Sequence, residues 1–197
     1  DKTVRGTAII FIVQGWKEDP DTLPFLKDRA LQDEHGNIRL VAAKAIAEGW
    51  KEDPDTLPWL KDHALQGADE YFRYAALNAI AEGWKEDPDT LLWVKDRALQ
   101  DEDYRVRRAV INTIIQNGQE DPELFEFLAN ISLNDPFNRE DDWQPNPRQV
   151  ALEGLLENFI DNPKTLEILN QVTLNDADEQ LREFAIQRLN DLKNTNP

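Results

Sequence analysis

The chain repeats itself, and the repeat limits what it can fold into. The nonapeptide Gly-Trp-Lys-Glu-Asp-Pro-Asp-Thr-Leu occurs three times, with its tryptophans at Trp16, Trp50 and Trp84, 34 residues apart. Weaker copies place Pro122 one step further and Pro163 after a step of 41 residues. A period of this length is typical of stacked supersecondary units, none of which buries its apolar face alone. We therefore predict one array, residues 1–197, with units at about 1–16, 17–50, 51–84, 85–118, 119–159 and 160–197.

Each unit contains the signals for two helices. The first is expected to begin at the Asp-Pro-Asp-Thr segment, with Asp19, Asp53 and Asp87 as N-caps and proline at the first helical position. The second carries apolar residues at helical spacing and ends at glycine, as in Gly49 and Gly83, where a left-handed C-cap is predicted. No segment predicts a strand. The sequence thus predicts an all-α fold, a right-handed α-solenoid of about five and a half helical hairpins and eleven helices.

An acidic residue recurs six positions before an arginine that opens the second helix. Asp33 precedes Arg39, Asp101 precedes Arg107 and Asp176 precedes Arg182, whereas the Asp135 to Arg148 step is widened by seven residues. The copy around Arg73 departs from this pattern, with Gly67 in the acidic position and Asp69 nearby. A 34-residue period also fits tetratricopeptide repeats, but the placing of these residues resembles HEAT repeats. The resemblance implies that an aspartate–arginine ladder ties successive units together.

The repeat at residues 49–62, Gly-Trp-Lys-Glu-Asp-Pro-Asp-Thr-Leu-Pro-Trp-Leu-Lys-Asp, resembles a narrower group. It is similar to HEAT-like repeats that follow NACHT-type NTPase modules in bacteria, cyanobacteria especially. The resemblance implies a sensing or partner-binding region of a signalling ATPase. The chain itself contains no Gly-x-x-x-x-Gly-Lys-[Ser/Thr] phosphate loop.

Composition disfavours several other classes. With 39 acidic and 22 basic residues the formal net charge is -17, so the chain repels phosphate backbones and anionic lipid, and we expect no nucleic-acid or membrane partner. It has no cysteine, which fits a reducing, cytoplasmic location. His35 and His63 fall at different repeat positions and make no metal-ligand spacing. We expect no metal, no cofactor and no catalytic residue.

The candidate partner-binding residues lie on the second helices, at positions counted from the ladder arginine. These positions differ between copies although the scaffold around them barely changes, which is the pattern expected of a specific binding face on the concave side of the array. Tyrosine and arginine, frequent interface anchors, are prominent among them. The candidates are Asn37, Leu40, Lys44, Tyr71, Tyr74, Asn78, Arg105, Arg108 and Asn112.

A second candidate is the enlarged turn 134–147, because insertions in repeat proteins map to loops and are frequently functional. Phe137 and Trp143 are candidate partner contacts there; the alternative, which we favour, is local packing that holds the turn shut. The repeated tryptophans are interpreted as inter-repeat packing and the acidic clusters as helix caps.

The two ends of the chain differ. The opening segment Ala8-Ile-Ile-Phe-Ile-Val13 is apolar on every side of a helix, so we expect an upstream domain to pack on it; self-association is the alternative. The last helix is polar on its outer face, as a terminal repeat requires. The sequence therefore predicts a C-terminal fragment of a larger protein.

The leading hypothesis is a non-catalytic scaffold that binds a protein partner or ligand on its concave face. The alternative is a bilin-handling subunit like the HEAT-like phycobilin lyases, which requires an apolar groove. Binding of DNA, as in HEAT-like glycosylases, requires a basic stripe, and Arg105 and Arg108 supply only two charges.

Overall fold

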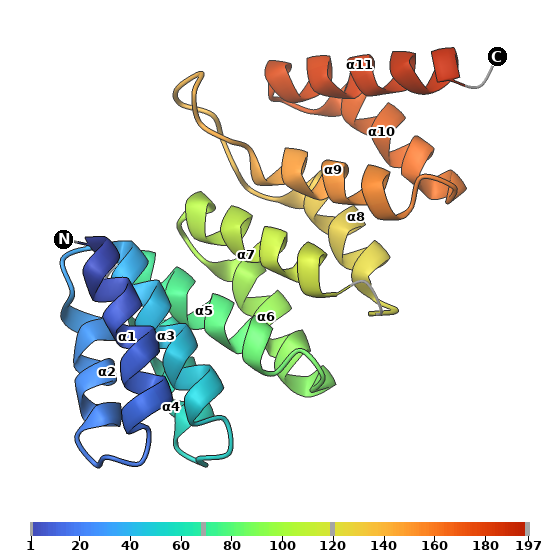
Figure 1. Ribbon diagram of the computed structural model, residues 1–197. Helices are drawn as coiled ribbons and strands as arrows, with labels where there is room; N and C mark the ends of the chain where they lie inside the picture. Colours follow the sequence, from blue (N-terminus) through green and yellow to red (C-terminus); the bar gives the residue numbers. More distant parts are fainter. Residues whose placement is uncertain (1, 68–69, 119–120, 196–197) are drawn as a thin grey trace. The chain divides into compact units, whose positions relative to one another are not determined.

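The computed structural model describes residues 2–67, 70–118 and 121–195, and Figure 1 shows them as helices joined by turns and loops. Eleven α-helices follow one another in these ranges, and none of the described residues forms a strand. The chain divides into two compact units, Asp1–Ala98 and Leu99–Pro197. The predicted all-α class and the predicted number of helices are confirmed.

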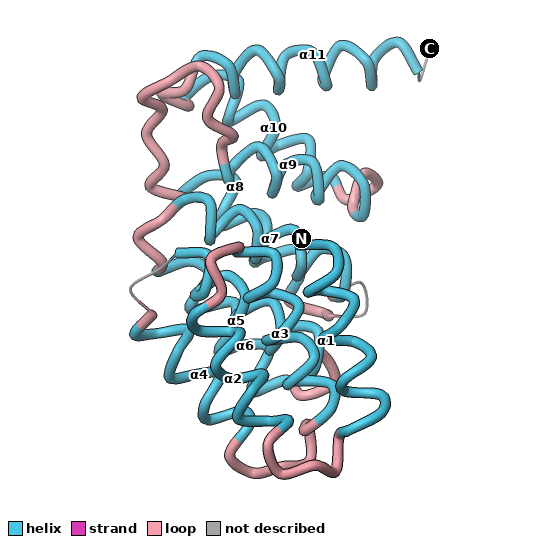
Figure 2. The backbone as a smooth tube through the Cα atoms, turned by 60° about the vertical axis from the view of Figure 1, so that its left-hand side comes forward, coloured by secondary structure: helices cyan, strands magenta, loops and turns pink. Residues whose placement is uncertain are grey.

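The first unit consists of a single helix followed by helical pairs. Helix α1 corresponds to the second helix of a repeat, as do α3 and α5, and these three pack side by side in one layer. Helices α2 and α4 are first helices and pack against them in another layer (Figure 2). Helix α6 ends two residues beyond the unit. The bounds are α1 Lys2–Trp16, α2 Thr22–Gln32, α3 Gly36–Gly49, α4 Thr56–Gln66, α5 Glu70–Gly83 and α6 Pro88–Gln100.

The second unit repeats the same two-layer plan. Helix α9 packs against α7 and α11, while α8 and α10 form the other layer. The bounds are α7 Tyr104–Asn117, α8 Leu124–Asn134, α9 Pro147–Asn158, α10 Pro163–Asn175 and α11 Glu179–Thr195. Within each unit, therefore, the helical pairs stack side by side, which is the arrangement of an α-solenoid.

The second helices stack closely because their buried stripes are rich in small residues. In α3 the stripe includes Ile38, Ala42 and Ile46, and in α5 it includes Ala76 and Ile80, all nearly inaccessible to solvent. Alanine lets two helix axes approach, and isoleucine fills the space between them. Burial of these stripes is the main force that holds one pair against the next.

The first helices of the early repeats begin later than predicted. Helices α2 and α4 begin at Thr22 and Thr56, and the carboxylate of Asp19 accepts a hydrogen bond from the amide of Asp21 at 2.9 Å. Asp53 does the same for Asp55. The aspartates thus close a turn before the helix instead of capping it. An aspartate side chain can accept a hydrogen bond from the backbone amide two residues later both in a turn and at a helix N-cap, so the sequence pattern alone does not distinguish the two. Helix α6 begins at the predicted proline, Pro88, and α10 begins at the corresponding proline of the last copy, Pro163.

The second helices end where predicted but not in the predicted conformation. Helices α3 and α5 finish at Gly49 and Gly83, yet none of the described glycines has a positive φ angle. Trp50, which follows α3, closes the helix by donating its backbone amide to Ile46 O at 2.9 Å. The left-handed glycine cap was therefore a wrong prediction, because an ordinary backbone bond ends the helix.

The repeated tryptophans are not equivalent. Trp84 is buried and Trp50 is half-buried, but Trp16 is 60% exposed. Trp16 ends α1, which packs mainly against α3 and also contacts α2. The predicted packing role is therefore wrong for Trp16, because covering such a side chain requires a neighbouring helix on both sides.

Gly154 in α9 provides a test of this close packing. A methyl group there would lie 2.6 Å from Ile115 Cδ1 of α7 and 3.2 Å from Leu128 Cδ1 of α8. We expect Gly154→Ala to lower the free energy of unfolding by about 1–3 kcal/mol, measured by urea denaturation. Gly15→Ala is the control, because no atom lies within 4 Å of the added carbon and alanine favours a helix. Equal stability of the two variants would contradict the close packing.

Candidate functional site

Buried ion pairs between consecutive repeats set the second helices in register. Arg107 donates from Nε and Nη2 to the two carboxylate oxygens of Asp135, at 2.8 and 2.9 Å. Arg148 and Asp176 form the same pair, with Nε 2.9 Å from Oδ2. In the first unit Arg5 donates to Asp33 at 3.3 Å. Each pair joins residues 28 positions apart, so the arginine of one repeat binds the aspartate of the next repeat.

Each ladder arginine also binds the loop of its own repeat. Arg39 donates to Asp33 O at 2.6 Å, and Arg107 donates to Asp101 O at 2.8 Å. Arg182 and Asp176 O make the same contact at 2.6 Å. Arg73 donates at 3.0 Å to the carbonyl of Gly67, so the departure in sequence leaves this contact in place. Asp69 lies outside the described residues.

We call the candidate partner-binding residues on the second helices the candidate row. In the first unit its members differ in how exposed their side chains are. Asn37 and Tyr71 are exposed, whereas Leu40, Lys44 and Tyr74 are half-buried. Lys44 pairs with Glu82 at 2.7 Å, and the guanidinium of Arg39 lies over the Tyr71 ring, 5.7 Å from its centroid. These side chains come from α3 and α5, which pack against each other.

Asn78 does not point outward, contrary to the prediction. Its side chain is 3% exposed, and its Nδ2 donates to the hydroxyl of Tyr74 at 3.0 Å, one helical turn earlier. The buried face of α5 is wider than that of α3, because every residue from Ala75 to Ala81 is buried. A position five after the ladder arginine therefore falls inside the packed face here.

In the second unit the row begins on α7. Arg105 is exposed and pairs with Asp103, whose side chain caps the helix by accepting from the backbone amide of Arg105 at 2.7 Å. The hydrogen bond from Arg105, which outweighs partial burial, lowers the pKa of Asp103. Arg108 and Asn112 are half-buried on the same helix.

The two aromatic residues of the enlarged loop have different environments. Phe137 is buried, 6% exposed, and packs edge-on against Tyr104 with ring centroids 5.0 Å apart. Its assignment as a partner contact was wrong, and the packing alternative holds for it because the ring fills the space between the loop and the start of α7. Trp143 is 74% exposed and stays a candidate contact.

Arg139 fastens this loop to the start of α11. Its guanidinium binds both carboxylate oxygens of Asp178, with Nη2 2.8 Å from Oδ2, and also donates to the carbonyl of Gln144. Asn146 Nδ2 donates to Asp178 at 2.8 Å, and Asp178 accepts from the amide of Gln180 at 3.0 Å. Burial opposes the charge of Asp178, but these hydrogen bonds outweigh it and lower its pKa.

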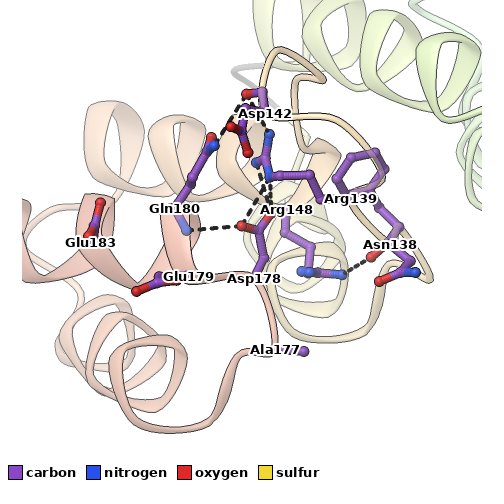
Figure 3. Close-up of a pocket in the computed structure, with 10 residues that line it drawn as sticks. Asn138, Arg139, Asp142, Arg148, Ala177, Asp178, Glu179, Gln180 and Glu183 are labelled. Carbon is purple, nitrogen blue, oxygen red and sulfur yellow. Dashed lines mark hydrogen bonds and ion pairs between the residues drawn. The ribbon is translucent and has the colours of Figure 1, made fainter.

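Beside this network the loop and α11 line an open cavity of about 570 Å³ (Figure 3). Glu183, one position after ladder residue Arg182, lines it, so the cavity adjoins the second-helix row of this unit. The two arginines that line it are held in internal ion pairs. Figure 3 labels the lining residues Asn138, Arg139, Asp142, Arg148, Ala177, Asp178, Glu179, Gln180 and Glu183, and Phe137 completes the set.

One of the two histidines packs against aromatic rings. His63 lies between Trp59 and Phe72, with ring centroids 4.5 and 5.6 Å away, and its Nδ1 is 2.8 Å from Trp59 O. Among the described residues no group of three potential metal ligands is brought together.

None of the described helices combines the length and apolar character needed to cross a membrane.

Several residues that build the site were not among the sequence candidates. Arg5 belongs to the ladder, and its position 34 residues before Arg39 was the signal that could have identified it. Arg139 and Asn146 had no such signal, because the loop that carries them occurs once and follows no period. Asp178 lies four residues before Arg182, as Asp103 lies before Arg107, and this spacing was the signal for it.

Comparison with known protein families matches the chain to HEAT repeats over residues 1–81 and 57–140. Comparison with curated proteins and with solved structures gave no significant match. The two family matches overlap and together cover residues 1–140, well over half of the chain, and the protein therefore belongs to the HEAT-repeat family.

Proposed function

We propose that the protein is a non-catalytic scaffold that binds another protein through the exposed face of its second helices. HEAT repeats generally serve as scaffolds for protein interaction. The observation that carries the proposal is a contrast within the chain. Asn37, Tyr71 and Arg105 occupy one repeat position and are all exposed, yet they differ completely in chemistry. A fixed scaffold with changing outward residues suits recognition of one specific partner.

Affinity capture with the immobilised chain tests this proposal. Proteins retained from an extract of the source organism would be identified and quantified for the wild type and for Tyr71→Ala. Loss of a tyrosine anchor from the interface is expected to reduce retention of the true partner at least about tenfold. Leu65→Ala and Leu92→Ala are matched controls, because both residues are exposed and lie on first helices α4 and α6. Identical retention by all variants would contradict the proposal.

Gly36 gives an independent way to disturb the same tyrosine. A Cβ atom at Gly36 would lie 2.9 Å from Cδ1 and 3.2 Å from Cγ of the Tyr71 ring. Because the ring must move aside, we expect Gly36→Ala to reduce partner retention several-fold although the hydroxyl and ring are still present. Thermal unfolding measured by circular dichroism should change little, since Gly36 is at the first turn of α3. Unchanged retention would show that the position of Tyr71 does not matter.

The finer proposal is that this scaffold is the sensing region of a NACHT-type signalling ATPase. Its support is the resemblance of residues 49–62 to repeats that follow such ATPases. The exposed apolar residues Val4, Ile10 and Phe11 of α1 would then pack against the upstream domain. The coding sequence upstream of Asp1 tests this directly, because a phosphate-loop NTPase module must be encoded there.

Bilin handling is less well supported. A bilin requires a largely apolar groove, whereas polar and charged side chains make up most of the wall of the cavity beside α11. Mixing the protein with phycocyanobilin is expected to leave the absorbance spectrum of the pigment unchanged. A shifted or sharpened absorbance band would favour the bilin role over the scaffold.

A further inference from the structure

On most second helices the polar candidate residues form hydrogen bonds or ion pairs with one another or with a neighbouring helix. The positions one and five after the ladder arginine illustrate this. On α5, Asn78 donates to Tyr74, and on α9, Gln149 Nε2 donates to Glu153 Oε1 at 3.0 Å. On α3, Lys44 pairs with Glu82. On α11 the corresponding residues, Glu183 and Gln187, are exposed, so water can satisfy them.

Helix α7 is different. Tyr104, Arg108 and Asn112 are spaced four residues apart and therefore lie on one face of the helix. All three are half-buried. In the part of the chain that the structure describes, the Tyr104 hydroxyl, the Arg108 guanidinium and the Asn112 amide make no hydrogen bond or ion pair, and Tyr104 contributes only its ring contact with Phe137. We call these three residues the α7 stripe.

Arg108 is the most unusual member of the α7 stripe. Every other arginine of the described chain has a polar partner, as expected in a protein with 39 acidic residues. The Nε of Arg108 is shielded from solvent and has no hydrogen-bond acceptor. The same is true of Nε in Arg5, Arg39 and Arg148, but those three arginines donate from Nη1, whereas Arg108 does not. A shielded donor without a partner destabilises the folded chain, and binding an external acceptor would remove that cost.

We propose that the α7 stripe binds a carboxylate of the partner, carried on an acidic peptide segment. This inference rests on the proposed scaffold function and names the chemistry of its partner. A guanidinium matches a carboxylate in a bidentate, charge-assisted pair. The hydroxyl of Tyr104 and the amide of Asn112, one turn to either side, can hydrogen-bond the adjacent peptide groups. Because the net charge of -17 repels an acidic segment at long range, the affinity must come from these short-range contacts.

Selection from a random 12-residue peptide library displayed on phage tests the inference without knowledge of the natural partner. The wild-type chain is expected to select peptides that share an Asp or Glu at one aligned position. Arg108→Met, which keeps the aliphatic length but removes all donors, is expected to lose that preference. Peptides without a shared acidic residue, or enriched in Lys and Arg, would overturn the inference and leave the scaffold proposal standing. Failure to select any peptide would count against the scaffold proposal itself.

A double-mutant cycle then isolates the contact. One selected peptide is synthesised with its shared Glu or Asp and with the corresponding amide, and both are titrated against the wild type and Arg108→Met. Loss of the carboxylate should weaken binding to the wild type at least about tenfold, but binding to Arg108→Met less than about twofold. Equal losses for both proteins would overturn the pairing.

A stability measurement separates this role from a structural one. Because Arg108 has no internal partner, Arg108→Met should unfold at the same temperature as the wild type or higher, measured by circular dichroism without peptide. Arg107→Met, one residue away in the buried ladder, is the matched control and should unfold at a markedly lower temperature. A lower unfolding temperature for Arg108→Met would show that Arg108 has a structural role and would overturn the inference.

Discussion

Asp135→Ala is expected to lower the free energy of unfolding by about 3–5 kcal/mol, because it leaves the buried Arg107 charge without its partner. The two side chains are 4% and 1% exposed, so water cannot replace the lost carboxylate. Asp135 also accepts the backbone amide of Phe137 at 2.9 Å, so the start of the enlarged loop loses a bond as well. Urea denaturation followed by circular dichroism measures the change.

Glu126→Ala is the matched control for this prediction. This substitution also removes a carboxylate from the second unit, but the Glu126 side chain is 70% exposed and pairs with Lys164 at 3.2 Å. An exposed pair of this kind contributes roughly 0–1 kcal/mol. Replacing both members of the buried pair, Arg107→Met with Asp135→Leu, should recover part of the loss, since no uncompensated charge then remains. A small effect of Asp135→Ala would show that the ladder does not hold the repeats together.

Asp178→Ala is expected to cost about 3–5 kcal/mol at neutral pH, because it leaves Arg139 without its buried partner. The Asp178 side chain is 4% exposed, and it also binds Asn146 and the first amides of α11. Hydrogen exchange followed by mass spectrometry should show faster exchange over residues 135–146 and at the start of α11. Unchanged exchange in the loop would mean that Arg139 does not fasten it to α11.

Asp103→Ala is the control for the helix cap alone. Asp103 caps α7, but its partner Arg105 is exposed, so the loss should stay near 0.5–2 kcal/mol, the range for an N-cap.

Acid should have the same effect as the Asp178 substitution. The pKa of Asp178 is lowered in the folded chain, so its contribution to stability is present above the ordinary aspartate pKa of 3.8 and is lost as the pH falls further, through the lowered folded value. The difference in unfolding free energy between the wild type and Asp178→Ala should therefore be complete at pH 7 and shrink below about pH 3.8. A difference that stays constant down to pH 2 would contradict the ionised pair.

Part of the candidate site could be predicted because it follows the repeat. Counting from the ladder arginine places Asn37, Tyr71 and Arg105 at one position, and the structure finds all three exposed. The same counting failed for Asn78, because the width of a buried helix face depends on the size of the side chains on neighbouring helices. Counting also could not show that Asn78 would form a hydrogen bond with Tyr74, whereas Arg108 and Asn112 would form none with each other.

The sequence by itself determined the helices, their number and their pairing, because the apolar period, the turn residues and the 34-residue step are properties of neighbouring residues along the chain. Only the tertiary structure decided which charges meet. The partner of Arg107 is Asp135 in the next repeat, 28 residues away, and the partner of Arg139 is Asp178, 39 residues away. Such pairs depend on how one helical pair packs on the next, so they are fixed by distances in space, which separation along the chain does not give.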